Sequence, residues 1–373
     1  MTMWLIIMWT TLAVTGIGLV YLSSRLEKFG FMDKLTDCRP KRKSVLSIVL
    51  VFGLFALIGW QINFMNAIVC TVYFALVWAL CDFANWLIIK IRRKIFKRYY
   101  AGVCAFVISI AALACGWYLD HQVWQTDYNL NTQKSVRPLK IAMFADSHLG
   151  TTFDAEGFAV HLANIQAQQP DMLIIAGDFV DDGTSREDML KACQALGKFQ
   201  TRYGTYFAFG NHDSGYYGSA YRGFGAHELI AALQQNGVKV LRDEAVLVDN
   251  ELYIIGRRDL SDVREKHGAR QSMQELMQNL DNQKYTIVID HQPADYAAQA
   301  DAGVDLVLSG HTHGGQLFPF NQVGKWIGAN DRIYGLEKRG NTNFIVTSGI
   351  SDWAIKFKTG TKSEYVIINV EQK

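Results

Sequence analysis

Four long apolar stretches in the first third of this 373-residue chain limit what it can fold into. They cover residues 3–22, 45–64, 67–89 and 101–119, and each approaches the roughly 20 residues that a helix needs to cross about 30 Å of hydrocarbon. A cleaved signal peptide is the alternative for the first stretch, but its front has no positive charge and the apolar run is too long. We therefore predict a four-helix transmembrane region over residues 1–120.

Charge is distributed unevenly along the chain. Residues 1–120 hold 13 Lys and Arg against 5 Asp and Glu, a net charge of about +8, whereas the remainder holds 24 against 30, about −6. The positive residues of the first part gather between 25 and 43 and between 90 and 98, and the loop at 63–66 has no charge. Because Lys and Arg accumulate on the cytoplasmic side, these loops predict that the chain after residue 119 lies on the extracytoplasmic side, periplasmic or external.

The second part of the chain has the pattern of an α/β domain. Residues 121–138 are polar and lack periodicity, so we predict a linker there. Short apolar runs rich in Val, Ile, Phe and Tyr then indicate buried strands at 139–145, 172–176, 205–209, 252–255, 285–289, 306–308, 344–347 and 365–370. Helical patterns occupy 158–168, 186–199, 228–235 and 272–280. This order predicts one domain, residues 139–373, with two packed sheets and helices on their outer faces.

Five polar clusters follow strands of this predicted domain. In chain order they contain Asp146 and His148, Asp178 and Asp181, Asn211 and His212, His291, and His311 and His313. Ligands of open α/β sheets collect beyond the carboxyl ends of the strands, so these side chains are expected to meet. Each cluster alone is more often a turn, a cap or a solvated pair. All five in one order within one domain favour a metal site.

The residue types indicate two transition-metal ions. Asp146 and His148 are two residues apart, and in an extended segment their side chains would share one side of the backbone. Asp178 offers two oxygens that can bridge cations about 3.5–4 Å apart. Mixed nitrogen and oxygen ligands suit Mn, Fe or Zn better than Mg or Ca. We therefore predict two divalent metal ions, with Mn as the first candidate and Fe or Zn as alternatives.

Residues 305–316, with the sequence DLVLSGHTHGGQ, form the most specific of these motifs. Together with the earlier clusters this block resembles the calcineurin-like metallophosphoesterase superfamily, in particular its small bacterial membrane-associated members. The resemblance runs from about residue 139 to the C-terminus and implies a four-layer α/β/β/α sandwich. It places one metal ion on Asp146, His148, Asp178 and His313, and the other on Asp178, Asn211, His291 and His311.

The resemblance also implies a mechanism. Two cations lower the pKa of a bridging water so that hydroxide exists near neutral pH, and they neutralise the phosphoryl oxygens during attack. His212, beside Asn211 but not assigned to metal, is the natural general acid for the leaving alkoxide. Asp181 is expected to hold the His212 imidazolium, as a similar pair does in the family, and Asp213 is a weaker candidate for that role.

One residue and one short segment depart from the patterns of related proteins. Asp182 stands where the protein-phosphatase branch of the superfamily has a phosphate-binding Arg, so protein phosphatase activity is not expected. The segment 351–358 does not match an arginine-bearing segment expected in close relatives. The substrate must therefore be sought outside the protein-phosphatase branch.

We predict a membrane-anchored, dinuclear metal-dependent phosphoesterase that hydrolyses a phosphodiester or phosphomonoester. Anchoring raises the local concentration of lipid-linked esters, and the aromatic-rich loop 214–226 adds to that hypothesis. The expected partners are the lipid bilayer and the phosphoester, with no nucleic acid. The alternative is a membrane sensor or transporter-like module with the phosphoesterase domain as effector. Asp82, an ionisable residue in the third apolar stretch, motivates that alternative, unless it is a satisfied polar contact within the bundle.

Overall fold

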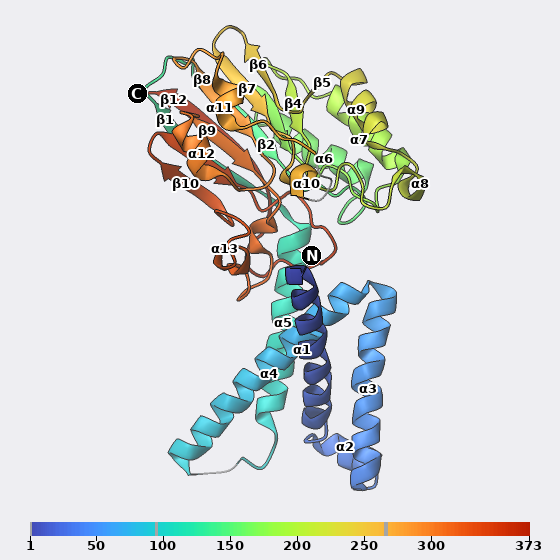
Figure 1. The fold of residues 1–373 in the computed structure, drawn as a ribbon. Helices are drawn as coiled ribbons and strands as arrows, with labels where there is room; N and C mark the ends of the chain where they lie inside the picture. The colour runs from blue at the N-terminus through green and yellow to red at the C-terminus, as the bar shows by residue number, and fades with distance from the viewer. Residues whose placement is uncertain (1, 94–95, 265–267) are drawn as a thin grey trace. The chain divides into compact units, whose positions relative to one another are not determined.

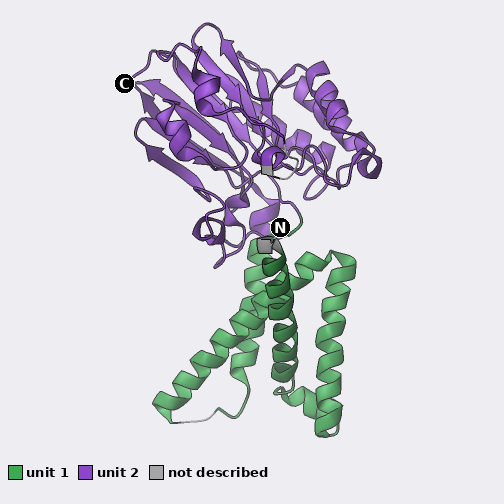
Figure 2. Ribbon diagram, viewed as in Figure 1, with its two compact units in different colours: residues 1–117, 354–356 green, residues 118–353, 357–373 purple. Residues whose placement is uncertain are grey.

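The computed structural model describes residues 2–93, 96–264 and 268–373 and separates the chain into two compact units (Figures 1 and 2). The first unit is Met1–Trp117 together with the short segment Ala354–Lys356. The second unit is Tyr118–Trp353 with Phe357–Lys373. The division along the chain therefore falls close to residue 120, where the composition changes.

The first unit is helical. Its helices are α1 (Thr2–Leu26), α2 (Gly30–Leu35), α3 (Pro40–Gln61), α4 (Phe64–Arg92) and α5 (Tyr100–His121), the last turn of which belongs to the second unit. Four of them are long and apolar enough to cross a membrane by length and composition, and these match the four predicted stretches. Many large apolar side chains on them are exposed, which fits lipid rather than water as their solvent.

Asp82 of α4 is a satisfied polar contact inside this unit. Its carboxylate accepts hydrogen bonds from the hydroxyl groups of Tyr99 at 2.7 Å and Tyr21 at 3.1 Å, and one oxygen lies 2.7 Å from Arg25 Nε. Buried charges are tolerated when they are paired and hydrogen-bonded in this way. The structure therefore supports the structural explanation of Asp82, and a ligand-sensing role for it stays a prediction.

Two six-stranded sheets form the centre of the second unit (Figure 1). The first sheet contains, in order across it, β1 (Val123–Thr132), β12 (Ser363–Gln372), β2 (Leu139–Phe144), β3 (Met172–Ala176), β4 (Thr205–Ala208) and β5 (Val238–Leu241). The second contains β10 (Gly335–Arg339), β11 (Thr342–Val346), β9 (Leu306–Ser309), β8 (Tyr285–Ile289), β7 (Leu252–Gly256) and β6 (Glu244–Val248). Strands β2 to β5 are parallel, as are β11, β9, β8 and β7, so the carboxyl ends of each set lie along one edge.

Alternating side chains of these strands build three apolar layers. In β2, Ile141 and Met143 lie in the core between the two sheets, whereas Ala142 and Phe144 face the helices. The first sheet is covered by α6 (Ala155–Gln166), α7 (Arg186–Gly197) and α9 (Ala226–Gln235), and the second by α11 (Met273–Met277) and α12 (Tyr296–Asp301). Short helices α8 (Ser219–Arg222), α10 (Leu260–Arg264) and α13 (Val323–Trp326) lie in connections. The predicted four-layer α/β/β/α sandwich is confirmed.

The predicted linker at 121–138 is wrong over most of its length. Val123–Thr132 forms β1, which pairs in parallel with β12 over ten residues at the edge of the first sheet. One face of an edge strand and its outer edge meet water, so polar residues such as Asn129 and Asn131 fit there while Leu130 is buried. The polar composition thus came from an edge position rather than from an unstructured connection.

Removing β1 should destabilise the second unit. A soluble version that begins at Leu139 would leave the long edge of β12 unpaired, whereas one that begins at Gln122 keeps it covered. We expect the shorter version to melt about 5 °C lower or more, since each kcal/mol shifts the melting temperature of a domain this size by roughly 2–4 °C. Thermal unfolding and size-exclusion profiles of both versions measure this, and equal melting temperatures would contradict it.

Candidate metal centre

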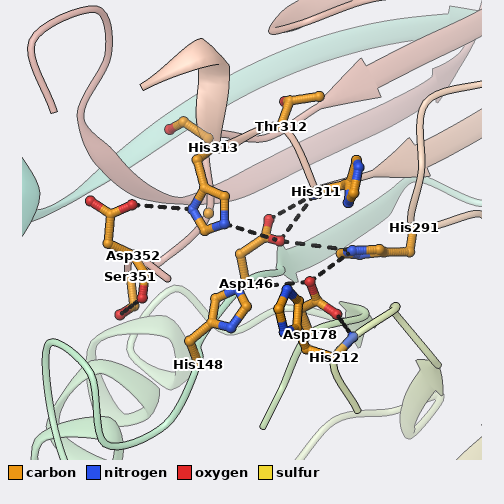
Figure 3. A network of polar contacts seen from close by, with 12 residues as sticks. Asp146, His148, Asp178, His212, His291, His311, Thr312, His313, Ser351 and Asp352 are labelled. Carbon is orange, nitrogen blue, oxygen red and sulfur yellow. Dashed lines mark hydrogen bonds and ion pairs between the residues drawn. The ribbon is translucent and has the colours of Figure 1, made fainter. Parts of the chain in front are cut away.

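The five polar clusters meet at the carboxyl ends of the central strands of the second unit (Figure 3). Each ligand predicted from the sequence follows a strand: Asp146 and His148 come after β2, Asp178 after β3, Asn211 after β4, His291 after β8, and His311 and His313 after β9. The hydrogen bonds of the connecting loops hold them there; for example, Asp146 accepts from the backbone N–H of His311 at 3.0 Å. Residues up to 167 positions apart along the chain therefore share one buried space.

The side chains fall into two groups, each of which is part of one of the two ligand sets that the family resemblance implies. Asp146, His148 and His313 offer ligand atoms within 4.8 Å of one another, and so do Asp178, His291 and His311. Asn211 belongs beside the second group, because its Oδ1 lies 2.9 Å from His311 Nδ1. Each of these two groups could hold a metal ion.

Asp178 lies between the two groups. Its Oδ2 is 3.7 Å from His148 Nε2 in the first group and 3.1 Å from His291 Nε2 in the second. Its other oxygen accepts the backbone N–H of His212 at 2.8 Å, which fixes the carboxylate plane. A carboxylate in this position can contact both ions at once.

Unpaired polar atoms inside this space fit positively charged ions. His148 is fully buried, yet neither of its ring nitrogens makes a hydrogen bond, and the same holds for His291 Nε2. His291 Nδ1 lies 2.7 Å from the carbonyl oxygen of Ala176, which only accepts, so Nδ1 carries a proton and Nε2 is the ring nitrogen directed toward Asp178. A buried polar atom without a partner costs about 1–3 kcal/mol, and metal coordination would remove that cost.

Five of the seven predicted ligands have left-handed backbone conformations. The φ angles are 55° at Asp146, 35° at His148, 52° at Asp178, 70° at His311 and 47° at His313. The predicted extended segment at Asp146 and His148 is therefore wrong, and a tight turn brings the two side chains together instead. Residues other than glycine rarely adopt this backbone conformation, and those that are held in it cluster at functional sites.

Two glycines allow the close approach of backbone to ligand carboxylates. A Cβ on Gly210 would lie 2.2 Å from Asp178 Oδ1, and a Cβ on Gly310 would lie 2.5 Å from Asp146 Oδ2. No larger residue fits either position without moving the carboxylate. The glycines that precede Asn211 and His311 in the sequence are thus part of the ligand geometry.

Burial and neighbouring charges shift the pKa values of several candidate ligands. Burial raises the pKa of Asp146 to about 6, and the neighbouring Asp178 contributes in the same direction. Burial together with the charge of His291 lowers the pKa of His311 to about 4. Burial opposes ionisation of Asp178 too, but His291 holds its pKa well below the usual range. Carboxylates and neutral imidazoles are the protonation states that bind metal, and bound cations would favour both.

Asp181 faces a different histidine from the one expected. Its Oδ2 lies 3.4 Å from Nδ1 of the ligand His148, and this contact outweighs burial to hold the pKa of Asp181 below its ordinary value. The described residues show no hydrogen bond between Asp181 and His212. A second carboxylate, Asp213, accepts four backbone N–H groups, from residues 178, 179, 180 and 210, so it shapes the loops rather than orienting His212. The predicted Asp181–His212 pair therefore stays a prediction, and the contact with His148 is the observed one.

His212 stands next to the ligands without belonging to either group. Its ring packs edge to face with His148 at 5.0 Å and with Tyr216 at 5.1 Å, measured between ring centroids. Trp353 covers another side at 5.6 Å. Burial lowers the pKa of His212, although the charge of Asp178 opposes the change. A low pKa makes the protonated imidazole a strong proton donor.

Asp352 and Lys358 are functional-site residues that the sequence did not suggest. Asp352 is fully buried, and its Oδ1 lies 3.4 Å from Nδ1 of the ligand His313. Lys358, also fully buried, donates to the carbonyl oxygens of Ser348 at 2.7 Å and Ser351 at 2.9 Å and so fixes the loop that carries Asp352. Nothing in the local sequence identifies this carboxylate, because its role depends on how residues 347–363 fold back toward β9.

Replacing Asp352 with Ala should weaken metal binding. A carboxylate on the distal nitrogen of a ligand histidine fixes the ring and its tautomer, and removing it typically lowers metal affinity by about 10–100-fold. Asp352→Asn keeps an oxygen that accepts from Nδ1 and is expected to lie between Ala and the native chain. Metal titration followed by elemental analysis measures both variants, and native affinity in Asp352→Ala would contradict the expectation.

Comparisons with known proteins agree with this geometry. Residues 139–315 match the model of the calcineurin-like phosphoesterase family. An uncharacterized metallophosphoesterase of Aquifex aeolicus is 30% identical over 250 residues, which cover 66% of this chain and 91% of the relative. A metallophosphoesterase of Campylobacter jejuni is 31% identical over 64% of this chain and 60% of its own, and a bovine transmembrane protein with a metallophosphoesterase domain is 30% identical over 62% and 52%.

The chain therefore spans between half and two thirds of the length of those last two relatives. Among solved structures, a 5'-nucleotidase precursor from Thermus thermophilus aligns over 63% of this chain and 54% of its own, with 17% identity and a TM-score of 0.37. The two-sheet sandwich holds buried carboxylates and imidazoles that could bind metal ions. The chain belongs to the calcineurin-like metallophosphoesterase superfamily.

Proposed function

We propose that this protein is a membrane-anchored phosphoesterase that uses two divalent metal ions to hydrolyse a phosphodiester or phosphomonoester. The observation that carries the proposal is the position of Asp178 Oδ2 between the two ligand groups. Mn is the first candidate for the ions, with Fe or Zn as alternatives, because the groups combine imidazole nitrogens with carboxylate and amide oxygens.

Each residue of the site would have a separate role in binding or orienting the metal ligands. Asp146, His148 and His313 would hold one ion, Asn211, His291 and His311 the other, and Asp178 both. Bound cations lower the pKa of water and neutralise phosphoryl charge. Asp181 and Asp352 orient their histidines, and the carbonyl oxygen of Ala176 orients His291.

His212 is the proposed general acid. It is adjacent to Asn211, it touches the His148 ring, and neither ring nitrogen is required as a ligand. Its imidazolium would give its proton to the leaving oxygen, a transfer that typically contributes about 10²–10⁴-fold to the rate. The aromatic rings of Tyr216 and Trp353 restrict water around it and hold the ring plane.

The proposal includes the side of the membrane on which the second unit lies. The four apolar helices support insertion into a membrane, and the basic loops at 25–43 and 90–98 support a cytoplasmic position for those loops. The catalytic unit would then lie on the extracytoplasmic side. Protease accessibility of the second unit in intact cells or spheroplasts measures this, and cleavage only after lysis would contradict it.

The test of the activity uses the purified full chain. We expect two metal ions per chain after loading with Mn, and hydrolysis of a p-nitrophenyl phosphodiester or phosphomonoester that a chelator abolishes and Mn restores. Parallel loading with Fe and Zn identifies the more effective metal. Turnover that survives complete metal removal would overturn the proposal.

One observation favours the second candidate function, a membrane module with the phosphoesterase as effector. Within the first unit, the side chains of Asn63 and Asn66 both donate to the carbonyl oxygen of Ala354, and Asn66 accepts from the backbone N–H of Lys356. Ala354 follows Trp353 directly in the chain. If the membrane helices control hydrolysis, Asn66→Ala should change kcat without changing metal content, whereas an unaltered kcat would leave the helices as an anchor.

A further inference from the structure

The segment that follows the metal-binding motif of β9 exposes a concentration of large apolar side chains. They are Phe318, Phe320, Val323, Trp326 and Ile327, on α13 and the residues on either side of it. Phe318 and Trp326 are 62% and 73% exposed. We refer to residues 316–331 as the α13 segment. Five such side chains within ten residues are unusual on a surface that faces water, and contiguous apolar patches mark interaction sites.

A cation-lined cavity lies beside these side chains. It has a volume of about 190 Å³, and its lining includes Lys325, Arg332, Asn321 and Gly314. Gly314 directly follows the ligand His313, so the cavity borders the loop that carries the metal ligands. Lys325 supplies positive charge, Asn321 supplies a polar side chain, and Arg332 adds a guanidinium whose Nη1 already pairs with Glu337 at 3.0 Å. The lysine and the amide suit phosphate oxygens.

Chain connectivity keeps the second unit close to a membrane surface. Helix α5 spans 22 residues, about 33 Å at 1.5 Å per residue, and so just crosses the roughly 30 Å of hydrocarbon. It ends at His121, and β1 begins at Val123. Only Gln122 separates α5 from β1, so the chain offers no long linker at this point. A membrane that contains α5 is therefore an apolar phase near the start of the second unit.

We propose that the α13 segment docks on the headgroup region of an anionic phospholipid bilayer and brings the metal centre to phosphoesters carried by bilayer amphiphiles. Aromatic side chains such as Phe318 and Trp326 enter the interface, where amphipathic rings are favoured. Lys325 receives the phosphate of a lipid headgroup beside the loop that carries His313. The substrate class rests on the proposed function, whereas the docking surface does not.

A second exposed aromatic pair fits this role less well. Tyr217 and Tyr221 are 75% and 69% exposed and lie 5.4 Å apart in the loop 214–226. The carboxylate of Asp182 accepts the backbone N–H of Tyr217, and so places negative charge at that loop. Anionic headgroups would be repelled there, whereas Lys325 attracts them.

The experiment compares two esters with one leaving group, using the full chain reconstituted into vesicles of phosphatidylcholine and phosphatidylglycerol. One is water-soluble methyl p-nitrophenyl phosphate, and the other is a diacylglyceryl p-nitrophenyl phosphate mixed into the bilayer. We expect Phe318→Ser with Trp326→Ser to lower kcat/KM on the bilayer ester about tenfold or more, because two aromatic side chains that would enter the bilayer are lost. The rate on the soluble ester should not change. Val160→Ser with Leu247→Ser, two exposed apolar residues elsewhere, is the matched control and should change neither.

A charge variant tests the cavity separately. Lys325→Ala should remove most of the advantage that phosphatidylglycerol gives over phosphatidylcholine alone, and raised salt should do the same to the native chain. Equal losses on both esters in the aromatic variant would overturn the proposal. So would a selective loss on the bilayer ester in Tyr217→Ser with Tyr221→Ser instead.

Hydrogen exchange separates the docking surface from the activity. In nanodiscs of the same lipids, amides of the α13 segment should exchange more slowly in the native chain than in the aromatic variant. Slow exchange without hydrolysis of either ester, or of the monoester p-nitrophenyl phosphate, would keep the docking surface and refute the proposed function. Identical exchange in both chains with normal hydrolysis of the soluble ester would refute the docking surface alone.

Discussion

Asp178→Asn should abolish hydrolysis and reduce the metal content from two ions per chain to one or none. The native carboxylate is fully buried, and its Oδ2 faces His148 at 3.7 Å and His291 at 3.1 Å. An amide has the same shape but no charge and only one oxygen, so it cannot offset the repulsion between two cations. We expect kcat/KM to fall at least about a thousandfold, which corresponds to roughly 4 kcal/mol of transition-state stabilisation.

The control for this variant is Asp154→Asn. Asp154 caps α6 by accepting backbone N–H groups of residues 156 and 157, and Asn caps helices about as well as Asp. The same chemical change therefore leaves fold, metal content and activity near native. Elemental analysis and initial rates are measured on both proteins. Two ions and activity within tenfold of native in Asp178→Asn would show that the carboxylate does not bridge.

The meeting of the candidate ligands in one place was predictable, because the sequence shows both the residue types and their positions after the strands. Each ligand cluster follows a run of buried strand residues, so parallel pairing of β2, β3 and β4 brings Asp146, Asp178 and Asn211 to one edge without further assumptions. His291 and His313 arrive in the same way from the second sheet. Strand topology therefore carries most of the information about this site.

The backbone at the ligands was not predictable. Left-handed φ angles at Asp146, His148 and Asp178 contradict local preference, and only the packing of both sheets around the site maintains them. Asp181 illustrates the consequence. Its position five residues after β3 did not determine which histidine it would face, and the turn directs it to His148 at 3.4 Å.

Elements defined by long-range contacts were also missed. β1 has the composition of a connection, and only its partner β12, which lies 240 residues later, makes it a strand. Asp352 depends on a loop held by the buried Lys358. The exposed side chains of the α13 segment look like ordinary core residues in the sequence, because burial is a property of the fold and not of a residue type.

His212→Ala should slow hydrolysis without releasing metal. His212 belongs to neither ligand group, so two ions should remain bound. Loss of a general acid typically lowers the rate about 10²–10⁴-fold, and the full effect is expected for an alkyl ester, whose alkoxide must be protonated as it leaves. A p-nitrophenyl ester leaves as a stable anion and should be affected much less. His161→Ala, a histidine on α6 outside the site, is the control.

The pH dependence gives the second signature of His212. An acid works only while protonated, so the native rate on the alkyl ester should fall as pH rises through the pKa of His212, which burial lowers from its ordinary value. His212→Ala should lose that part of the profile and keep the rest. Initial rates across pH, with metal content measured at each end, distinguish the cases. An equal loss on both esters accompanied by loss of metal would show that His212 supports the ligands and that another group protonates the leaving oxygen.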